Sequence, residues 1–177
     1  MRLFTAIPLS TAITDRLGAL CSGVPGVKWA DPDQMHITLR FIGDVDGPTA
    51  SDIAGALDGV RGEPFDLDLA TIGHFGTGHR LRTLWVGVAE SPGLEQLQFR
   101  VDRAVSTVMG PTETRKFHAH VTLGRLKRTT PNLAGYLAQH EPFRAGPVSV
   151  KEFVLYSSHL GSERAIHTAE ARYPLSP

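Results

Sequence analysis

Hydrophobic and polar residues alternate along several short stretches of this chain, and elsewhere apolar residues recur every three to four positions. The first pattern is typical of β-strands with one buried face, and the second of amphipathic helices. Strands are predicted at Arg2–Leu9, Val27–Ala30, His36–Ile42, Phe65–Phe75, Arg82–Val88, Phe117–Leu126, Pro147–Tyr156 and Ala165–Tyr173. Helices are predicted to begin near Ser10, Gly47, Ser91 and Thr130, each at a capping or proline position. Helices interspersed among strands in this order predict an α+β fold.

Composition narrows the classes of protein. The 177 residues carry 18 Lys and Arg against 18 Asp and Glu, which excludes a broad basic surface but allows a local positive patch. A single cysteine, Cys21, excludes a disulfide framework and a zinc ribbon. The chain has no apolar run long enough to span a membrane, and its apolar N-terminal stretch is too short for a signal peptide. We therefore expect one domain over residues 1–177, monomeric and cytoplasmic, with no membrane association.

Two predicted strands carry the same motif about half a chain apart. One begins His36-Ile-Thr38-Leu and the other His120-Val-Thr122-Leu. Because side chains alternate along a strand, each histidine shares a face with its threonine, while the apolar residues between them point the other way. The repeat predicts two pseudo-symmetric lobes of antiparallel sheet, with helices outside and both motifs facing one groove.

Two histidines around one centre suit acid–base displacement at phosphorus. A neutral imidazole can take a proton from the attacking group while a protonated one gives a proton to the leaving oxygen. The threonine hydroxyls can donate to the phosphate oxygens, and Arg125 is the candidate cation. Strand parity places Arg125 on the opposite face from His120 unless the strand twists near Gly124. Arg40, by contrast, shares the parity of His36 and is predicted to face the groove.

Other interpretations of these residues remain open. A lone His-x-Thr is a weak signal, because a half-exposed strand with a surface histidine looks the same. His118, His120 and His36 together would allow a metal site, though without the acidic or cysteine partners usual there. Basic residues of the predicted hairpin tip at 73–80, together with Lys127 and Arg128, are candidates either for RNA contacts or for solvated loops.

The paired motifs resemble the 2H phosphoesterase superfamily, and within it the RNA 2′,3′-cyclic phosphodiesterases, also called 2′-5′ RNA ligases. The resemblance covers nearly the whole chain. It is carried by the paired motifs and by the segments Arg2–Ile7, Trp29–Phe41, Leu84–Val88, Phe117–Arg125 and Leu155–Ser158.

The resemblance implies a two-lobed fold and a reaction without metal or other cofactor. It implies that His36 donates a proton and His120 accepts one, and that Thr38, Thr122 and Arg125 bind the phosphate. The substrate would be an RNA end or nucleotide with a 2′,3′-cyclic phosphate, hydrolysed to a 2′-phosphate. The ligase name implies a second, joining reaction, in which an RNA 5′-hydroxyl attacks the cyclic phosphate. Phe4 is a candidate to stack on a base.

The chain departs from the family pattern at three places. Ala119 stands where proline usually precedes the second motif, His118 occupies a position often held by arginine, and residues 166–168 lack a tyrosine that the family often carries. Two alternatives to the RNA phosphodiesterase follow: a non-catalytic protein that binds RNA ends or nucleotides, or a 2H phosphoesterase for another small phosphodiester.

Overall fold

The computed structural model describes residues 1–76, 82–111, 116–126, 133–161 and 165–177. The tip of the 73–80 loop, Lys127, Arg128 and the expected helix start at Thr130 lie outside these ranges. The elements, in chain order, are β1 (Arg2–Pro8), α1 (Thr11–Gly18), β2 (Val27–Trp29), the 3₁₀ turn η1 (Pro32–Gln34), β3 (His36–Asp44), α2 (Gly47–Asp58), β4 (Phe65–Phe75), β5 (Thr83–Val88), α3 (Pro92–Met109), β6 (His120–Leu126), α4 (Ala134–His140), β7 (Arg144–Val150), β8 (Glu152–Leu160) and β9 (Ala165–Pro174).

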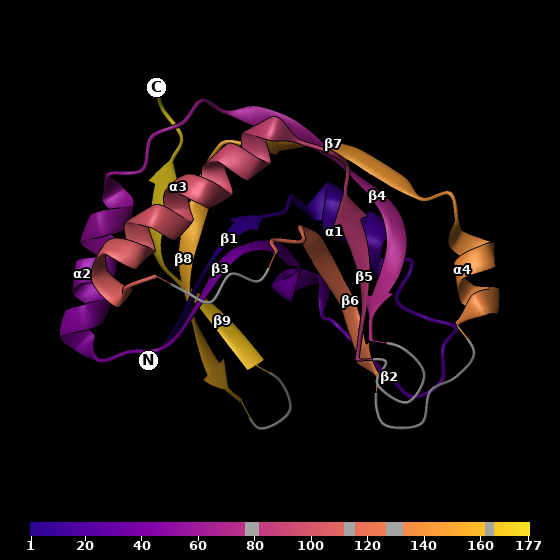
Figure 1. Ribbon diagram of the computed structural model, residues 1–177. Coiled ribbons are helices and arrows are strands. Elements are labelled where there is room, and N and C mark those ends of the chain that lie inside the picture. The colour runs from indigo at the N-terminus through magenta and orange to yellow at the C-terminus, as the bar shows by residue number, and fades with distance from the viewer. Residues whose placement is uncertain (77–81, 112–115, 127–132, 162–164) are drawn as a thin grey trace.

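The strands form two antiparallel groups that meet along one narrow seam. Their order is β7-β4-β5-β6-β3-β1-β8-β9, with β2 added beside β6. Between β6 and β3, in the middle of this order, the only residue pair in register within the described chain is Ile37 with Val121. The order is symmetric about that seam, since β3, β1, β8 and β9 mirror β6, β5, β4 and β7. Figure 1 shows the resulting two lobes, so the predicted pseudo-symmetric, two-lobed α+β fold is confirmed.

The helices cover the outer faces of the two lobes. Helices α2 and α3 pack on each other, with α3 against β3, whereas α1 lies against β7 and α4 against β4 (Figure 1). Helix α1 therefore crosses to the lobe opposite the strand that precedes it.

The sequence of α3 accounts for where this helix begins, which face it buries and where it ends. Ser91 accepts a hydrogen bond from the Leu94 amide at its start, Leu94, Leu97, Val101 and Val105 are buried, and it ends before Gly110 at a φ of 79°.

Two predicted strand boundaries are wrong. The stretch expected as one strand from Pro147 to Tyr156 is two strands, β7 and β8, separated at Lys151. Burial alternates in β7, at Val148 and Val150, but is continuous over residues 153–155 of β8, where the chain has passed from one lobe to the other. The strand expected to begin at Phe117 begins only at His120, because β5 pairs with β6 only up to that residue.

Candidate active site

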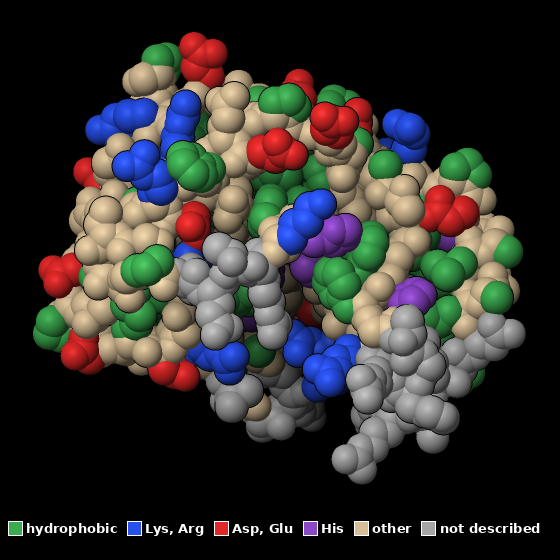
Figure 2. All heavy atoms as spheres, viewed as in Figure 1, with side chains coloured by type: hydrophobic (Ala, Val, Ile, Leu, Met, Phe, Trp, Pro, Cys, Tyr) green, Lys and Arg blue, Asp and Glu red, His purple; other side chains and the backbone are tan. Residues whose placement is uncertain are grey.

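His36 and His120 lie at the first positions of β3 and β6, on either side of the seam between the lobes. The paired residues Ile37 and Val121 are fully buried, so their neighbours on both strands point to the opposite face. Directly opposed residues of an antiparallel pair have Cα atoms about 4.5–5.5 Å apart. The single pair therefore brings both histidines, with Thr38 and Thr122, to the same face of the sheet, one pair from each side of the seam. Figure 2 shows histidine side chains gathered at the hollow in the middle of this face, with Lys and Arg side chains at its margin.

Each histidine is held by the same local hydrogen bond. Nδ1 of His36 lies 2.7 Å from the main-chain oxygen of Gln34, and Nδ1 of His120 lies 2.7 Å from that of His118. A carbonyl oxygen only accepts, so Nδ1 carries the proton and donates it in both cases. Each neutral ring therefore keeps Nε2 bare, and Nε2 is the atom able to accept or deliver a proton in the groove.

Aromatic side chains surround both histidines. The ring of His36 lies 4.9 Å from Phe4 and 5.3 Å from His167, measured between centroids. The ring of His120 lies 4.9 Å from Phe75 and 6.1 Å from His118. Packing on several rings leaves each imidazole few rotamers, which fixes the direction of Nε2.

These surroundings keep both rings neutral in the ligand-free protein. Burial lowers the pKa of His36 to about 4, with further lowering by His167 and His120 and partial compensation from the Gln34 carbonyl. Burial also lowers the pKa of His120, and the His118 carbonyl opposes that effect. Because His36 responds to the charge of His120, the two rings share one electrostatic environment across the seam.

A β-bulge resolves the parity difficulty at Arg125. In β6, Thr122 pairs with Trp85 but Gly124 pairs with Leu84, so Leu123 is an extra residue and the alternation of faces shifts after it. Arg125 consequently returns to the face of His120, where its charge adds to the larger effect of burial in lowering the pKa of His167.

A corresponding bulge in β3 shows that the prediction for Arg40 is wrong. Thr38 pairs with Ala6 and Arg40 with Thr5, which leaves Leu39 unpaired. Arg40 therefore points away from the groove, is 8% exposed, and forms an ion pair with Asp102 of α3. Phe41, which unbroken alternation from His36 would place on the apolar face with Ile37, is 71% exposed. Phe41 and Arg125 occupy equivalent positions on the two strands.

Phe4 lies beside His36 rather than in open space. It is 4% exposed, and its ring stacks on Tyr156 at 5.3 Å. In this structure Phe4 has no exposed face to offer a base. Both rings of this stack lie next to the His36 ring, so Phe4 helps to hold the histidine in place by packing against it.

Several groove residues escaped the sequence reasoning. Gln34, Tyr156 and His167 come from three elements that are far apart in the chain or carry no repeated motif. Gln34 lies two residues before His36, whereas Tyr156 and His167 reach it only through the pairing of β1 with β3 and β8, and of β8 with β9. The bulged position of Phe41 likewise has no local sequence signal.

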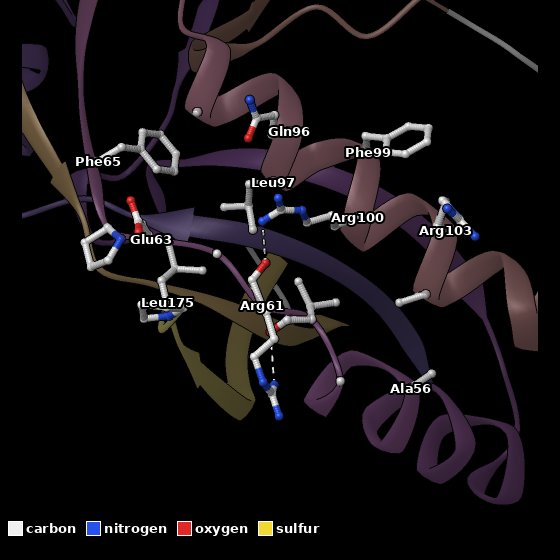
Figure 3. A pocket seen from close by; sticks show the side chains of 17 residues that line it. Ala56, Arg61, Glu63, Phe65, Gln96, Leu97, Phe99, Arg100, Arg103 and Leu175 are labelled. Atoms are coloured by element: carbon white, nitrogen blue, oxygen red, sulfur yellow. Dashed lines mark hydrogen bonds between the residues drawn. The ribbon is translucent and has the colours of Figure 1, made fainter.

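Two features of the described residues bear on whether a site lies outside the groove. A cavity of about 1050 Å³ lies between α2, α3 and the C-terminal residues, but its Arg61 and Arg100 are engaged by main-chain carbonyls (Figure 3). Over the described ranges, no three His, Cys, Asp or Glu side chains are grouped as metal ligands, so His118, His120 and His36 do not form such a site. No helix among the described residues is long and apolar enough to cross a membrane.

Comparison with known proteins defines the class. A family model described as LigT-like phosphoesterase matches residues 7–85 and again residues 86–167, one copy for each half. The chain belongs to this family.

Individual relatives cover nearly the same length. The chain is 31% identical over 170 residues to the RNA 2′,3′-cyclic phosphodiesterase of Archaeoglobus fulgidus, covering 94% of this chain and 96% of the relative. It is 36% identical over 149 residues to the protein of the same name from Aeropyrum pernix, covering 82% and 84%. Escherichia coli LigT complexed with 3′-AMP superposes with a TM-score of 0.78 at 25% identity, covering 99% of this chain and 98% of that one. A Thermus thermophilus protein, TT0787, has the same fold, with a TM-score of 0.81, 23% identity and the same coverage.

Proposed function

We propose that this chain is a phosphodiesterase that hydrolyses 2′,3′-cyclic phosphates at RNA ends, or on nucleotides, to 2′-phosphates. The observation that carries the proposal is the pair of histidines at the seam, each with Nδ1 bound to a carbonyl and Nε2 left bare. The names of the full-length relatives from Archaeoglobus and Aeropyrum support the substrate class.

In the proposed reaction one imidazole takes a proton from water as it attacks phosphorus, and the other protonates the departing 3′-oxygen. Both rings are neutral before substrate binds, because burial lowers the pKa of each. The cyclic phosphate carries a negative charge, and bringing that charge to the seam raises the pKa of a facing imidazole. The donor role that the resemblance gives His36 therefore depends on the bound substrate to make the protonated form available.

The remaining groove residues bind the substrate in this proposal. Thr38 and Thr122 donate hydroxyl protons to the non-bridging oxygens, where charge grows in the transition state. Arg125 adds a cation on the same face. Phe41, rather than Phe4, offers an exposed ring on which a base can stack.

The test compares His36→Asn and His120→Asn with wild type on a cyclic mononucleotide and on an RNA oligonucleotide with a cyclic end. Each variant should lose roughly 10²–10⁴-fold in turnover, as expected for one acid–base group. His140→Asn on α4 is the matched control and should keep the wild-type rate. A near-normal rate in either seam variant would refute the assignment, and binding of the cyclic end without turnover would favour a non-catalytic binder.

Product analysis refines the same experiment. Phosphorus NMR should show a 2′-phosphomonoester, and added EDTA should leave the rate unchanged because the proposal uses no metal. An RNA strand with a 5′-hydroxyl, supplied with the cyclic end, tests whether a 2′-5′ linkage also forms. A faster rate on another small phosphodiester would reassign the substrate within the 2H group.

We further propose that the chain acts as a cytoplasmic monomer. The large exposed hydrophobic side chains of the described residues come from separate elements, among them Phe41 on β3, Phe99 on α3 and Ile166 on β9. Burial raises the pKa of the Cys21 thiol to about 11, which disfavours the reactive thiolate. Sedimentation at working concentration tests the monomer, and fractionation of cells tests the location.

A further inference from the structure

A third histidine, His167 of β9, lies beside His36 and has no role in the reaction described above. Its ring centroid is 5.3 Å from that of His36 and 4.9 Å from that of Phe4. Its main-chain N–H donates to the side-chain oxygen of Gln34 at 3.1 Å, while the main-chain oxygen of Gln34 accepts from His36. One residue, Gln34, thus fixes both histidines relative to each other.

The surroundings of His167 select the tautomer opposite to that of the two seam histidines. Its Nδ1 is buried and has no hydrogen-bond partner, so a proton placed there would be an unsatisfied buried donor. The His167 side chain as a whole is only partly buried, so with Nδ1 enclosed it is the Nε2 edge of the ring that is left to share a proton with water or a ligand. Neutral His167 therefore presents an N–H at Nε2, where neutral His36 and His120 present a bare nitrogen.

The charges around His167 favour an anion. Arg125 of β6 is close enough for its positive charge to lower the pKa of His167, in addition to the larger lowering by burial. Among the described residues, His36 of β3 also faces it and is likewise kept from acquiring charge by its own burial. His167 thus stays neutral near pH 7 beside a cation, and a phosphate between Arg125 and His167 would receive one charged and one neutral donor.

We propose that His167 is a phosphate-binding residue, which donates a hydrogen bond from Nε2 to a non-bridging oxygen of the substrate and exchanges no proton during turnover. The inference rests on the proposed function, since it places the substrate's phosphate at the seam. The three histidines of the groove differ in which ring nitrogen carries the proton. His36 and His120, protonated at Nδ1, act on bridging oxygens or water, whereas His167, protonated at Nε2, binds the phosphate.

Two variants separate this role from the alternatives. His167→Gln keeps an N–H donor near the position of Nε2 without an ionisable group, whereas His167→Phe keeps a flat ring against Phe4 and His36 without a donor. We expect kcat/KM on a cyclic mononucleotide to fall about tenfold in His167→Phe, the effect of one hydrogen bond. In His167→Gln it should stay within about threefold of wild type, with an unchanged pH profile, because the donor remains.

Other outcomes overturn the inference in recognisable ways. If His167 only packs against its neighbours, the phenylalanine variant will match wild type and the glutamine variant will be the weaker one. If His167 transfers a proton, both variants will lose activity by the roughly 10²–10⁴-fold of an acid–base residue and one limb of the pH profile will disappear.

A binding measurement keeps the inference separate from the proposed function. Inorganic phosphate, titrated by calorimetry, should bind about tenfold more weakly to His167→Phe than to wild type or His167→Gln. Absence of turnover by wild type would refute the proposed function, but the comparison of phosphate affinities would still test the role of His167. Equal phosphate affinity in all three proteins would sink the role of His167, even with full turnover by wild type.

Discussion

The buried state of His36 should make the protein lose stability as the pH falls. Its pKa is lowered from 6.5 to about 4 in the folded chain, mainly by burial, whereas the unfolded chain exposes the ring to water. Between these two values the unfolded state binds more protons than the folded state. The free energy of unfolding therefore falls as the pH drops through 6.5 toward 4, and the contribution is fully present only above the unfolded pKa.

The size of the effect follows from the shift. One pKa unit corresponds to about 1.4 kcal/mol, so a ring displaced from 6.5 to about 4 contributes about 3 kcal/mol over the full range. Between about pH 7.5 and pH 4.5 most of this contribution is lost, about 2 to 3 kcal/mol. That is a large share of the roughly 5–15 kcal/mol typical of a folded domain.

The assay compares wild type with His36→Asn by urea unfolding at both pH values. Asparagine keeps an N–H near the position of Nδ1, able to donate to the Gln34 carbonyl, but does not titrate. Carboxylates and the other histidines are common to both proteins, so the difference of the two pH differences isolates His36. Wild type should lose about 2 to 3 kcal/mol more than the variant on acidification. Equal losses, or a greater loss in the variant, would show that His36 is not buried uncharged beside His120.

Three further predictions concern the bulges and the rings behind the site. Arg40→Ala should lower the free energy of unfolding by about 2–3 kcal/mol in urea, because it leaves Asp102 unpaired and a gap under β3. Phe41→Ala should cost less than about 1 kcal/mol in the same assay, because the ring is 71% exposed, and a larger cost would contradict the bulged register. Gly73→Ala should reduce turnover in steady-state kinetics, because the new Cβ would overlap the Trp85 ring that packs against His120; an unchanged rate would show that the ring adjusts without moving the histidine.

Local patterns in the sequence were sufficient for most of the fold. The alternation in β3 and the apolar stripe of α3 placed these elements within a residue or two, and the repeated motif predicted the two lobes. What failed were features that depend on a partner strand. The bulges at Leu39 and Leu123 exist because at each of these points β3 or β6 has one residue more than the stretch of the neighbouring strand that it pairs with, and alternation alone cannot show this. His167 was missed because β9 reaches His36 only through the pairing of distant strands.

The two bulges also show how a symmetric frame supports an asymmetric reaction. Each strand begins with its histidine and has its threonine two positions later. Because of the bulge, the residue five positions after the histidine lies on the same face. In one copy that residue is Arg125, and in the other it is Phe41. Under the proposed function, a cation on one strand and an exposed ring on the other would favour one orientation of a nucleotide, with phosphate toward Arg125 and base toward Phe41. A chain with no net charge would then recognise an RNA end through a local cation such as Arg125, without a broad basic surface.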